Sequence, residues 1–170
     1  MTLFAALAGV ERYDLATANG LLVEWGHRLG PCERPFRSEA YALTVEGKPV
    51  AVAISASAVS AVVGDYRRNE VVELARLCAH PSCPWANRVL LRLWREVCAP
   101  RWASWTPQAA VSYSQNAHHT GDLYRFDGWE KVRENCGSTG GGTWSTRRAA
   151  DAPVAGRKTL WAWRYGASKH

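Results

Sequence analysis

The sequence predicts an α/β fold in which a mixed β-sheet is flanked by helices, with antiparallel hairpins at both ends of the chain. Hydrophobic residues make up 47% of the 170 residues and charged residues 21%, which is typical of a packed globular protein. The hydrophobic patterns follow the order helix, strand, strand, strand, helix, strand, helix, strand, strand. Because no repeat or linker divides the chain, we expect residues 1–170 to form a single domain.

The N-terminal part begins with a helical pattern and continues with a hairpin. Apolar residues recur at helical spacing over 11–29, and Asp14 is a plausible N-cap. Two segments with strand character, 39–46 and 49–56, are separated by two residues, the length of a tight turn. We therefore expect one helix followed by two paired strands.

The central part alternates between strand and helix. Residues 71–78 alternate between the two faces of a strand. Residues 85–98 are amphipathic, with apolar side chains on one helical face and arginines elsewhere. Residues 109–114 predict a short buried strand.

The C-terminal part predicts a short helix and two strands. The helix is expected over 120–126, since the Asp127-Gly128 pair can end it. Extended structure follows over 129–133, and an aromatic strand closes the fold over 159–165. Between these strands, 137–157 is rich in Gly, Ser, Thr, Arg and Ala and predicts a long hairpin loop.

Charge and cysteine content restrict the partners and the compartment. The formal net charge is +6 and the sequence pI is about 9.3, so the protein is attracted to polyanions such as nucleic acid or nucleotide phosphates. No apolar run approaches the roughly 18 residues that a membrane span needs, and we expect no membrane partner. An odd count of five Cys predicts no closed disulfide framework, and therefore a reduced, cytoplasmic protein.

The order of elements, together with the segment VSYSQNAHHTGDLYRFDGWEKV at 111–132, resembles the GNAT acyltransferase superfamily. The resemblance is closer to one branch, the Mom-type phage proteins that modify DNA, and covers roughly residues 20–135. It rests on the run ELARL at 73–77, on the early pair Trp25 and His27, and on the following residues of the segment: Ser112, Tyr113, Asn116, His119, Gly121, Tyr124, Gly128 and Trp129. It implies a splayed mixed sheet.

The resemblance implies a transferase encoded by a phage or prophage and acting in the bacterial cytoplasm. A Mom-like enzyme would transfer a small carbamoylmethyl-type group to the exocyclic amine of adenine in DNA. The alternative is an acetyl-CoA-dependent N-acetyltransferase that acts on a small amine or a protein. A third possibility is a nucleic-acid-binding module without catalytic activity. The donor and the oligomeric state stay open.

Six residues are candidates for catalysis, with a structural alternative for most of them. The resemblance implies that Ser112, Tyr113 and His119 surround the amine, with Arg76 and Tyr124 near the donor; His27 is a further candidate. Tyr124 matches the tyrosine that often protonates the leaving thiol in GNAT enzymes. The strand end at 112–114 can instead satisfy local backbone groups, Arg76 can pair with Glu73, and His27 can have a capping or packing role.

The expected donor site departs from the GNAT pattern. Typical GNAT enzymes hold the cofactor pyrophosphate with a Gly-containing turn before a helix, and this chain has Cys83-Pro84-Trp85-Ala86 there, with no Gly. The helix N-terminus and Arg88 can still hold an anion. The candidates for donor binding are therefore Arg88, Asn87 and Asn116.

Two further patterns concern metal and nucleic acid. The run Cys78-Ala-His80-Pro-Ser-Cys83 contains ligand types that suit zinc or iron, and His27, His118 and His119 with a carboxylate are a second possible metal site. In the last quarter, basic residues alternate with tryptophans. We expect Arg147 and Arg148 to contact phosphates and Trp144 to stack on an unpaired base, unless this region is a solvated hairpin with a Trp-rich seam.

Overall fold

The computed structural model describes residues 7–136 and 157–166, and its centre is a seven-stranded sheet. The strand order is β1-β2-β3-β6-β7-β9-β8, and every neighbouring pair is antiparallel except β6 and β7. The strands are β1 Ala8–Tyr13, β2 Ser38–Val45, β3 Lys48–Ala56, β6 Val71–Ala79, β7 Ala109–Gln115, β8 Glu130–Cys136 and β9 Lys158–Arg164. A small separate hairpin joins β4 Val62–Val63 to β5 Tyr66–Arg67.

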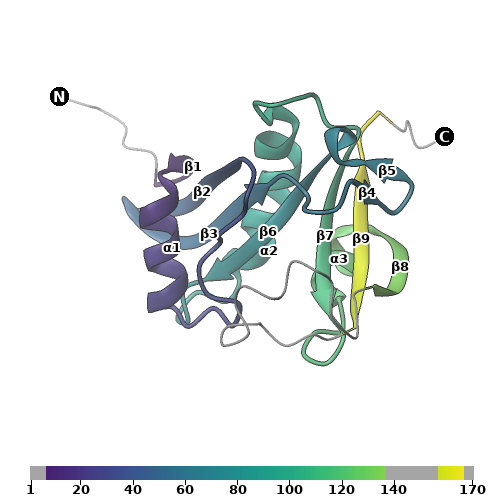
Figure 1. Cartoon of the computed structure of the whole chain (residues 1–170). Coiled ribbons are helices and arrows are strands. Elements are labelled where there is room, and N and C mark those ends of the chain that lie inside the picture. Colours follow the sequence, from purple (N-terminus) through teal and green to yellow (C-terminus); the bar gives the residue numbers. More distant parts are fainter. Residues whose placement is uncertain (1–6, 137–156, 167–170) are drawn as a thin grey trace.

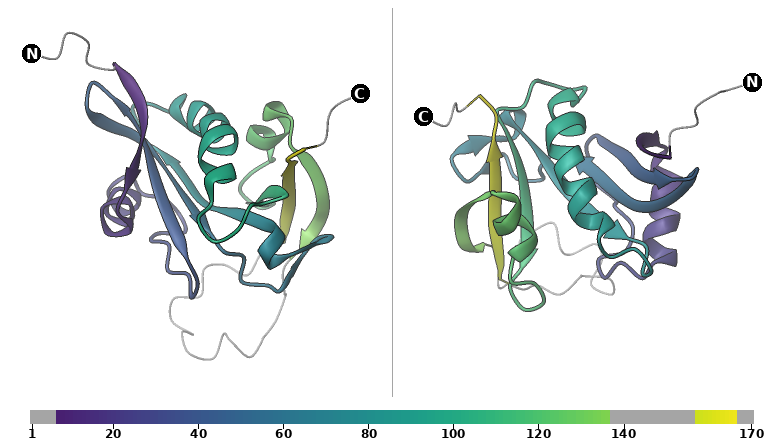
Figure 2. Two further views of the ribbon diagram at one scale, coloured as in Figure 1. Left: turned by 90° about the horizontal axis from the view of Figure 1, so that it is seen from above. Right: turned by 180° about the vertical axis from the view of Figure 1, so that it is seen from behind.

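Helices cover both faces of the sheet (Figures 1 and 2). Helix α1, Leu15–Glu24, packs on one face through Ala18 and Leu22. Helix α2, Ala86–Leu93, and the short helix α3, Asp122–Asp127, lie on the other face. The chain after α2 continues as a π-helical turn over Trp94–Cys98 and a 3₁₀ turn over Ala99–Arg101; another 3₁₀ turn, Arg68–Glu70, precedes β6.

This arrangement confirms the predicted fold class, a mixed splayed sheet between helices with antiparallel strands at both ends. No helix in the described part of the chain is long and apolar enough to cross a membrane. The long loop expected over 137–157 lies almost wholly outside the described residues.

The N-terminal prediction was wrong at its start. The helical pattern over 11–29 begins inside β1, which pairs with β2 along its whole length. The helix starts only after Asp14, whose carboxylate accepts a hydrogen bond from the Thr17 N–H at 2.8 Å. It ends before Gly26, which has a φ of +68°. The strand was missed because its polar and apolar residues also fit a helical period. The β4–β5 hairpin was missed because its strands have two residues each.

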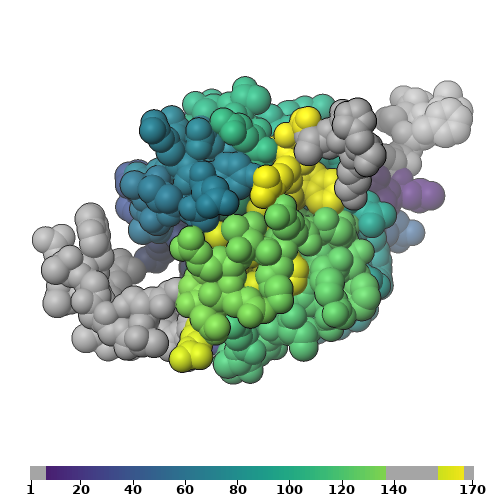
Figure 3. All heavy atoms as spheres, turned by 90° about the vertical axis from the view of Figure 1, so that its right-hand side faces the viewer, coloured from purple at the N-terminus to yellow at the C-terminus, as the bar shows by residue number. Residues whose placement is uncertain are grey.

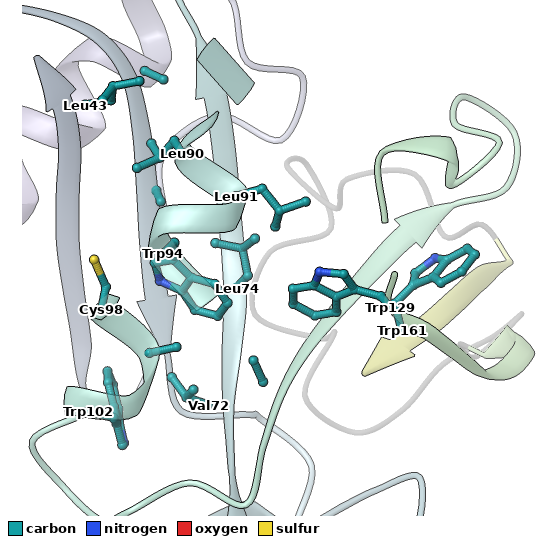
Figure 4. Close-up of a cluster of buried hydrophobic side chains, with 14 of the residues drawn as sticks. Leu43, Val72, Leu74, Leu90, Leu91, Trp94, Cys98, Trp102, Trp129 and Trp161 are labelled. Carbon is teal, nitrogen blue, oxygen red and sulfur yellow. The ribbon is translucent and has the colours of Figure 1, made fainter. Parts of the chain in front are cut away.

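The main core fills the space between the sheet and helices α2 and α3 (Figure 4). Leu90, Leu91 and Trp94 are fully buried and reach from the α2 segment to the sheet. The Trp94 indole N–H donates to Ser55 Oγ on β3 at 2.8 Å, which satisfies the buried polar atom of this side chain. The Trp94 ring also stacks on Trp129, which follows α3, with centroids 6.4 Å apart.

A charged contact links α2 to α3 at the edge of this core. Asp127, at the end of α3, accepts hydrogen bonds from Arg92 at 3.1 Å and Arg95 at 2.5 Å. The indole N–H of Trp129 donates to the same carboxylate at 3.0 Å. Asp127 therefore fixes α3 against α2, and with it the side chains that α3 carries.

Candidate active site

The two parallel strands β6 and β7 separate halfway along their length (Figure 1). Their pairing runs from Val71 opposite Ala109 to Leu74 opposite Ser112 and stops there. Beyond this point β6 continues against β3, and β7 continues against β9. Ala75 has no partner in the β3–β6 register, so a bulge bends β6 away at the point of separation. We call this opening the β6–β7 gap.

Ser112 and Tyr124 form a hydrogen-bonded pair at the start of the gap. The Ser112 hydroxyl donates to the Leu74 carbonyl at 3.1 Å and also lies 2.8 Å from the Tyr124 hydroxyl. Since the single proton of Ser112 is directed to the carbonyl, Tyr124 is the donor in the second bond. Burial raises the pKa of Tyr124, so its hydroxyl keeps its proton at neutral pH. The structure thus brings together two of the predicted site residues.

Helix α3 and two tryptophans hold the Tyr124 ring in position. The ring stacks on Trp161 of β9, with centroids 5.8 Å apart, and meets Trp129 edge-on at 5.3 Å. Trp161 is fixed by a 2.8 Å hydrogen bond to Ser114 Oγ. Gly121, which precedes α3, has a φ of +77°, and a Cβ there would lie 2.3 Å from the Trp161 ring. The backbone therefore passes close to the indole only because residue 121 is glycine.

The buried carboxylate of Glu73 lies on β6, one residue before the gap opens. It forms an ion pair with Arg34, from the segment between α1 and β2. Burial raises the pKa of Glu73, whereas the positive charges of Arg34, Lys158 and Arg76 act in the opposite direction. From the sequence, Glu73 was expected only as a possible partner for Arg76. A glutamate among apolar residues on a central strand was the signal that could have identified it. A carboxylate is rarely buried unless it is paired with a positive charge or belongs to a functional site.

Arg76 binds the segment between α1 and β2. Its guanidinium donates to the Gly30 carbonyl at 3.1 Å and the Pro31 carbonyl at 3.1 Å, with a longer contact to Leu29. These bonds account for its burial without an ion pair to Glu73. Arg76 therefore fixes this segment against β6, and a role near the donor stays a prediction.

His27 lies in the same segment, close to His119. Burial, together with the positive charges of Arg76 and Arg28, lowers the pKa of His27 to about 4. Its Nδ1 accepts a hydrogen bond from the Leu29 N–H at 3.2 Å, so the neutral ring carries its proton on Nε2. Partial desolvation of its ring also lowers the pKa of His119, and the positive charge of Arg28 lowers it further. Both imidazoles are neutral at pH 7, and their roles in proton transfer stay predictions.

Tyr113 and Asn116 occupy different surroundings from Ser112. Tyr113 points to the opposite face of the sheet, where burial raises its pKa to about 12 and the nearby Glu73 charge adds to the effect. Asn116 follows β7 and accepts a hydrogen bond from the Thr159 hydroxyl at 2.8 Å. This bond holds β7 to β9 at the wide end of the gap. Tyr113 is therefore separated by the sheet from Tyr124, although both were expected near the reacting groups.

A cleft of about 420 Å³ lies between α2 and α3. Its lining includes Arg88, Leu93, Leu123 and Phe126. Figure 3 shows the neighbouring surface, where α3 and β8 (green) lie beside exposed parts of β9 (yellow). The guanidinium of Arg88 lies 5.8 Å from the Phe126 ring centroid.

The N-terminus of α2 has less capacity for an anion than its position suggests. The N–H groups of Ala86 and Arg88 already donate to the Cys83 and Trp85 carbonyls, at 2.9 and 3.2 Å. Oδ1 of Asn87 is buried and has no hydrogen-bond partner among the described residues. A phosphate at this end would therefore depend on the Arg88 side chain more than on backbone groups.

The metal hypotheses find no support in the described residues. Residues 7–136 and 157–166 contain no group of three His, Cys, Asp or Glu side chains placed to hold a metal ion. Nδ1 of His80 lies 2.6 Å from Ser82 Oγ instead, and Cys78 is buried. The C-x-H-x-x-C run is therefore part of the connection from β6 to α2, and its expected ligands do not converge.

The structure does not test the expected nucleic-acid contacts. Arg147, Arg148 and Trp144 lie outside the described residues. Trp161 is 5% exposed in the main core, so it cannot stack on a base. Trp163 has Arg95 over its ring, 3.6 Å from the centroid. At the described end of this region, Trp161 and Trp163 therefore pack within the protein.

Comparison with solved structures finds this fold in acetyltransferases. The ribosomal-protein-S18-alanine N-acetyltransferase from Escherichia coli matches with a TM-score of 0.60 and 12% identity, over 96% of this chain and 99% of that chain. An acetyl transferase from Salmonella typhimurium that modifies the N-terminal serine of ribosomal protein L7/L12 matches with a TM-score of 0.59 and 8% identity, over 95% and 96%. A putative acetyltransferase from Salmonella typhimurium, solved with its cofactor acetyl-CoA, matches with a TM-score of 0.61 and 12% identity, over 97% and 98%.

These likenesses establish the fold alone, because the identities are low. No protein-family model and no curated protein matches the sequence. None of the three structures is described as modifying DNA. The closer resemblance to Mom-type proteins therefore stays a prediction.

Proposed function

We propose that this chain, which has the fold of the GNAT acetyltransferases, transfers an acyl group from an acyl-CoA thioester to an amine. The observation that carries the proposal is the Ser112–Tyr124 pair at the start of the β6–β7 gap. The Ser112 hydroxyl donates its own proton to the Leu74 carbonyl and holds the phenol of Tyr124 in place. The phenol keeps its proton and can donate it to a leaving group. The buried carboxylate of Glu73 on the adjacent strand is suited to accept a proton.

The surroundings of the gap fit an extended thioester donor. Past Leu74 and Ser112, neither strand pairs with the other, so both have an edge at which an arm with amide groups can form strand-like hydrogen bonds. The cleft between α2 and α3 lies on the face that carries Tyr124, and Arg88 can contact a phosphate there. When bound, the thioester would supply an activated acyl carbon.

The residues of this chain divide the proton transfers between two faces of the sheet. The amine nitrogen forms a bond to the acyl carbon and gives up one proton, which Glu73 accepts directly or through a water molecule. The carbon–sulfur bond breaks, and Tyr124 gives its proton to the departing sulfur. Ser112 keeps the phenol in place during this step. One proton is taken up and one is released, so the overall reaction produces an amide and a free thiol.

The test is acyl transfer by the whole chain with acetyl-CoA and a panel of amines. The expected result is release of free thiol together with an acetylated amine identified by mass spectrometry. Heat-unfolded protein provides the background rate. Thiol release no faster than this background with every amine would overturn the proposal.

A second candidate is modification of adenine in DNA, as the Mom-type resemblance implies. The observation that favours it is the formal net charge of +6, which attracts a polyanion. Duplex DNA is incubated with the protein and candidate donors, and the digested nucleosides are examined for adenine of increased mass. Replacing Arg147 and Arg148 with Ala would then decrease the slope of log affinity against log salt by about 1 to 2. Unmodified adenine with every donor would exclude this candidate.

A further inference from the structure

The two oxygens of the Glu73 carboxylate have different surroundings. The guanidinium of Arg34 contacts Oε1, and among residues 7–136 and 157–166 no other group forms a hydrogen bond with this carboxylate. In the same part of the chain, Oε2 of Glu73 is not among the buried polar atoms that lack a partner. Oε2 therefore has no protein partner and is still open to solvent or to a bound molecule.

A second buried glutamate shows how a carboxylate is held when both of its oxygens are occupied by the protein. Oε1 of Glu39 accepts a hydrogen bond from Arg37 at 2.9 Å and lies 3.5 Å from Arg12. Oε2 of Glu39 accepts from the Tyr41 hydroxyl at 2.9 Å. Buried polar atoms are normally paired in this way. Glu73 differs because one of its oxygens is left for a group from outside the protein.

Arg34 approaches Glu73 from a segment that is fixed to both α1 and β6. Two residues earlier, Cys32 is fully buried, and its N–H and carbonyl both bond to the Asn19 side chain, at 2.7 and 3.4 Å. The two carbonyls before Cys32 accept hydrogen bonds from Arg76 of β6, each at 3.1 Å. The Arg34 side chain itself is 21% exposed. Its guanidinium is therefore held beside Glu73 before any substrate binds.

The ionisation of Glu73 depends on Arg34 more than on any other described charge. Burial raises the pKa of Glu73, and a carboxyl group that is already protonated cannot accept a proton. Arg34 opposes this effect most strongly, followed by Lys158 of β9 and Arg76. The other titratable groups that interact with Glu73 have a raised pKa and are neutral at pH 7: Tyr113, Tyr124 and Cys32.

We propose that Arg34 is a positioning residue of the proposed active site: it holds Oε1 of Glu73, keeps the buried carboxylate ionised, and leaves Oε2 to accept the proton of the amine. The inference rests on the proposed function, since it concerns the base of the same reaction. As the amine nitrogen bonds to the acyl carbon, one N–H bond breaks and its proton passes to Oε2, directly or through a water molecule. Burial keeps Glu73 basic enough for this transfer, and Arg34 keeps it ionised beforehand.

A titration of Glu73 tests the inference without depending on turnover. The NMR resonance of its carboxyl carbon is identified by its loss from the spectrum of Glu73→Gln and is followed against pH in the whole chain. Arg34→Gln should move the titration to higher pH by at least about 1 unit, because a neighbouring guanidinium lowers the pKa of a carboxyl group by about 1–3 units. Arg34→Lys keeps the charge and should titrate close to the wild type.

Arg37→Gln is the matched control, since it removes an arginine that pairs with the buried Glu39 instead. It should leave the titration of Glu73 unchanged. The same titration of Glu73 in Arg34→Gln as in the wild type would overturn the inference. Should Arg34→Gln fail to fold, Arg34→Lys provides the test: a titration at the wild-type position supports the inference, and one displaced upward by a whole unit despite the retained charge overturns it.

Turnover separates this inference from the proposed function. In Arg34→Gln the rising limb of kcat/KM should move to higher pH together with the titration, and the lost rate should return above it. A loss at every pH, as expected of an arginine that only stabilises the fold, or a limb that stays in place, overturns the inference while the proposed function stands. No acyl transfer by the wild type with any amine overturns the proposed function, and the role of Arg34 in that reaction with it.

Discussion

At the scale of single residues, the proposed site depends on which group holds which proton. Tyr124 is protonated at neutral pH like any phenol, burial raises its pKa further, and its hydrogen bond to Ser112 fixes the direction of donation. Glu73 is a buried carboxylate with a raised pKa. A proton donor and a proton acceptor are thus held on neighbouring strands before any substrate binds.

Glu73→Gln should lower kcat by about 100-fold or more, because a general base contributes this much to a proton-transfer step. In the wild type, kcat/KM should rise with pH as Glu73 loses its proton, over a range above that of an ordinary glutamate since burial raises its pKa. The rising limb should disappear in the variant. The measurement is a pH–rate profile of both proteins.

Glu39→Gln is the matched control for this substitution. Glu39 is also buried, and it pairs with Arg37 and Arg12 at a distance from the gap. The Glu39→Gln substitution should alter the stability of the protein, while the folded variant keeps the wild-type turnover and pH profile. Equal losses of kcat in the two variants would remove Glu73 from the mechanism.

His27 makes the stability of the protein depend on pH. Its pKa is about 4 in the folded protein and 6.5 ordinarily, so the unfolded chain binds the proton more readily. The contribution of His27 to the free energy of unfolding is complete above pH 6.5 and is lost as the pH falls toward 4. Chemical denaturation at a series of pH values should show this loss, and His27→Gln should reduce it. The same loss in the variant would contradict the assignment.

At the scale of elements, the short helix α3 depends on its contacts rather than on its length. Six residues are too few for a stable isolated helix. Asp127 anchors α3 to α2, and Gly121 lets the chain pass over Trp161. The position of Tyr124 therefore follows from these contacts.

Gly121→Ala should destabilise the protein by about 2–4 kcal/mol. The new Cβ would lie 2.3 Å from the Trp161 ring, and the φ of +77° adds strain for any residue with a side chain. Thermal and denaturant unfolding measure the effect. Gly20→Ala is the control: Gly20 lies within α1, where a Cβ has open space, and the change should stabilise by about 0.4–1 kcal/mol. Equal stabilities of the two variants would contradict the described packing.

The strands and most helices could be predicted from local patterns, but the parts set by distant contacts could not. The alternation over 71–78 identifies β6, and it says nothing of the bulge at Ala75 that separates β6 from β7. The helical pattern over 11–29 includes the end of β1, so the strand could not be recognised there. The polar residues of β1 adopt strand conformation because they pair with β2. Ser112 and Tyr124 were both predicted for the site, whereas the role of Glu73 became visible only with its burial and its contact to Arg34.

At the scale of the whole molecule, the parallel pair within an otherwise antiparallel sheet creates the site. The sheet separates after Leu74 and Ser112, so groups on its two faces can reach a molecule held between the strands. The α3 side offers the proton donor, and the opposite face offers the carboxylate of Glu73. We therefore expect the acyl donor and the amine to enter from opposite faces of the sheet.

The measurement that tests this account most directly is kcat of Tyr124→Phe for acyl transfer from acetyl-CoA. The loss of one phenolic proton should lower kcat by roughly tenfold or more. The thermal transition should be nearly unchanged, because the ring still packs between Trp129 and Trp161. Tyr165→Phe removes another partly buried phenol, which donates to the Arg95 carbonyl at 2.7 Å outside the gap, and should keep the wild-type kcat. A kcat for Tyr124→Phe equal to that of Tyr165→Phe would contradict the central claim.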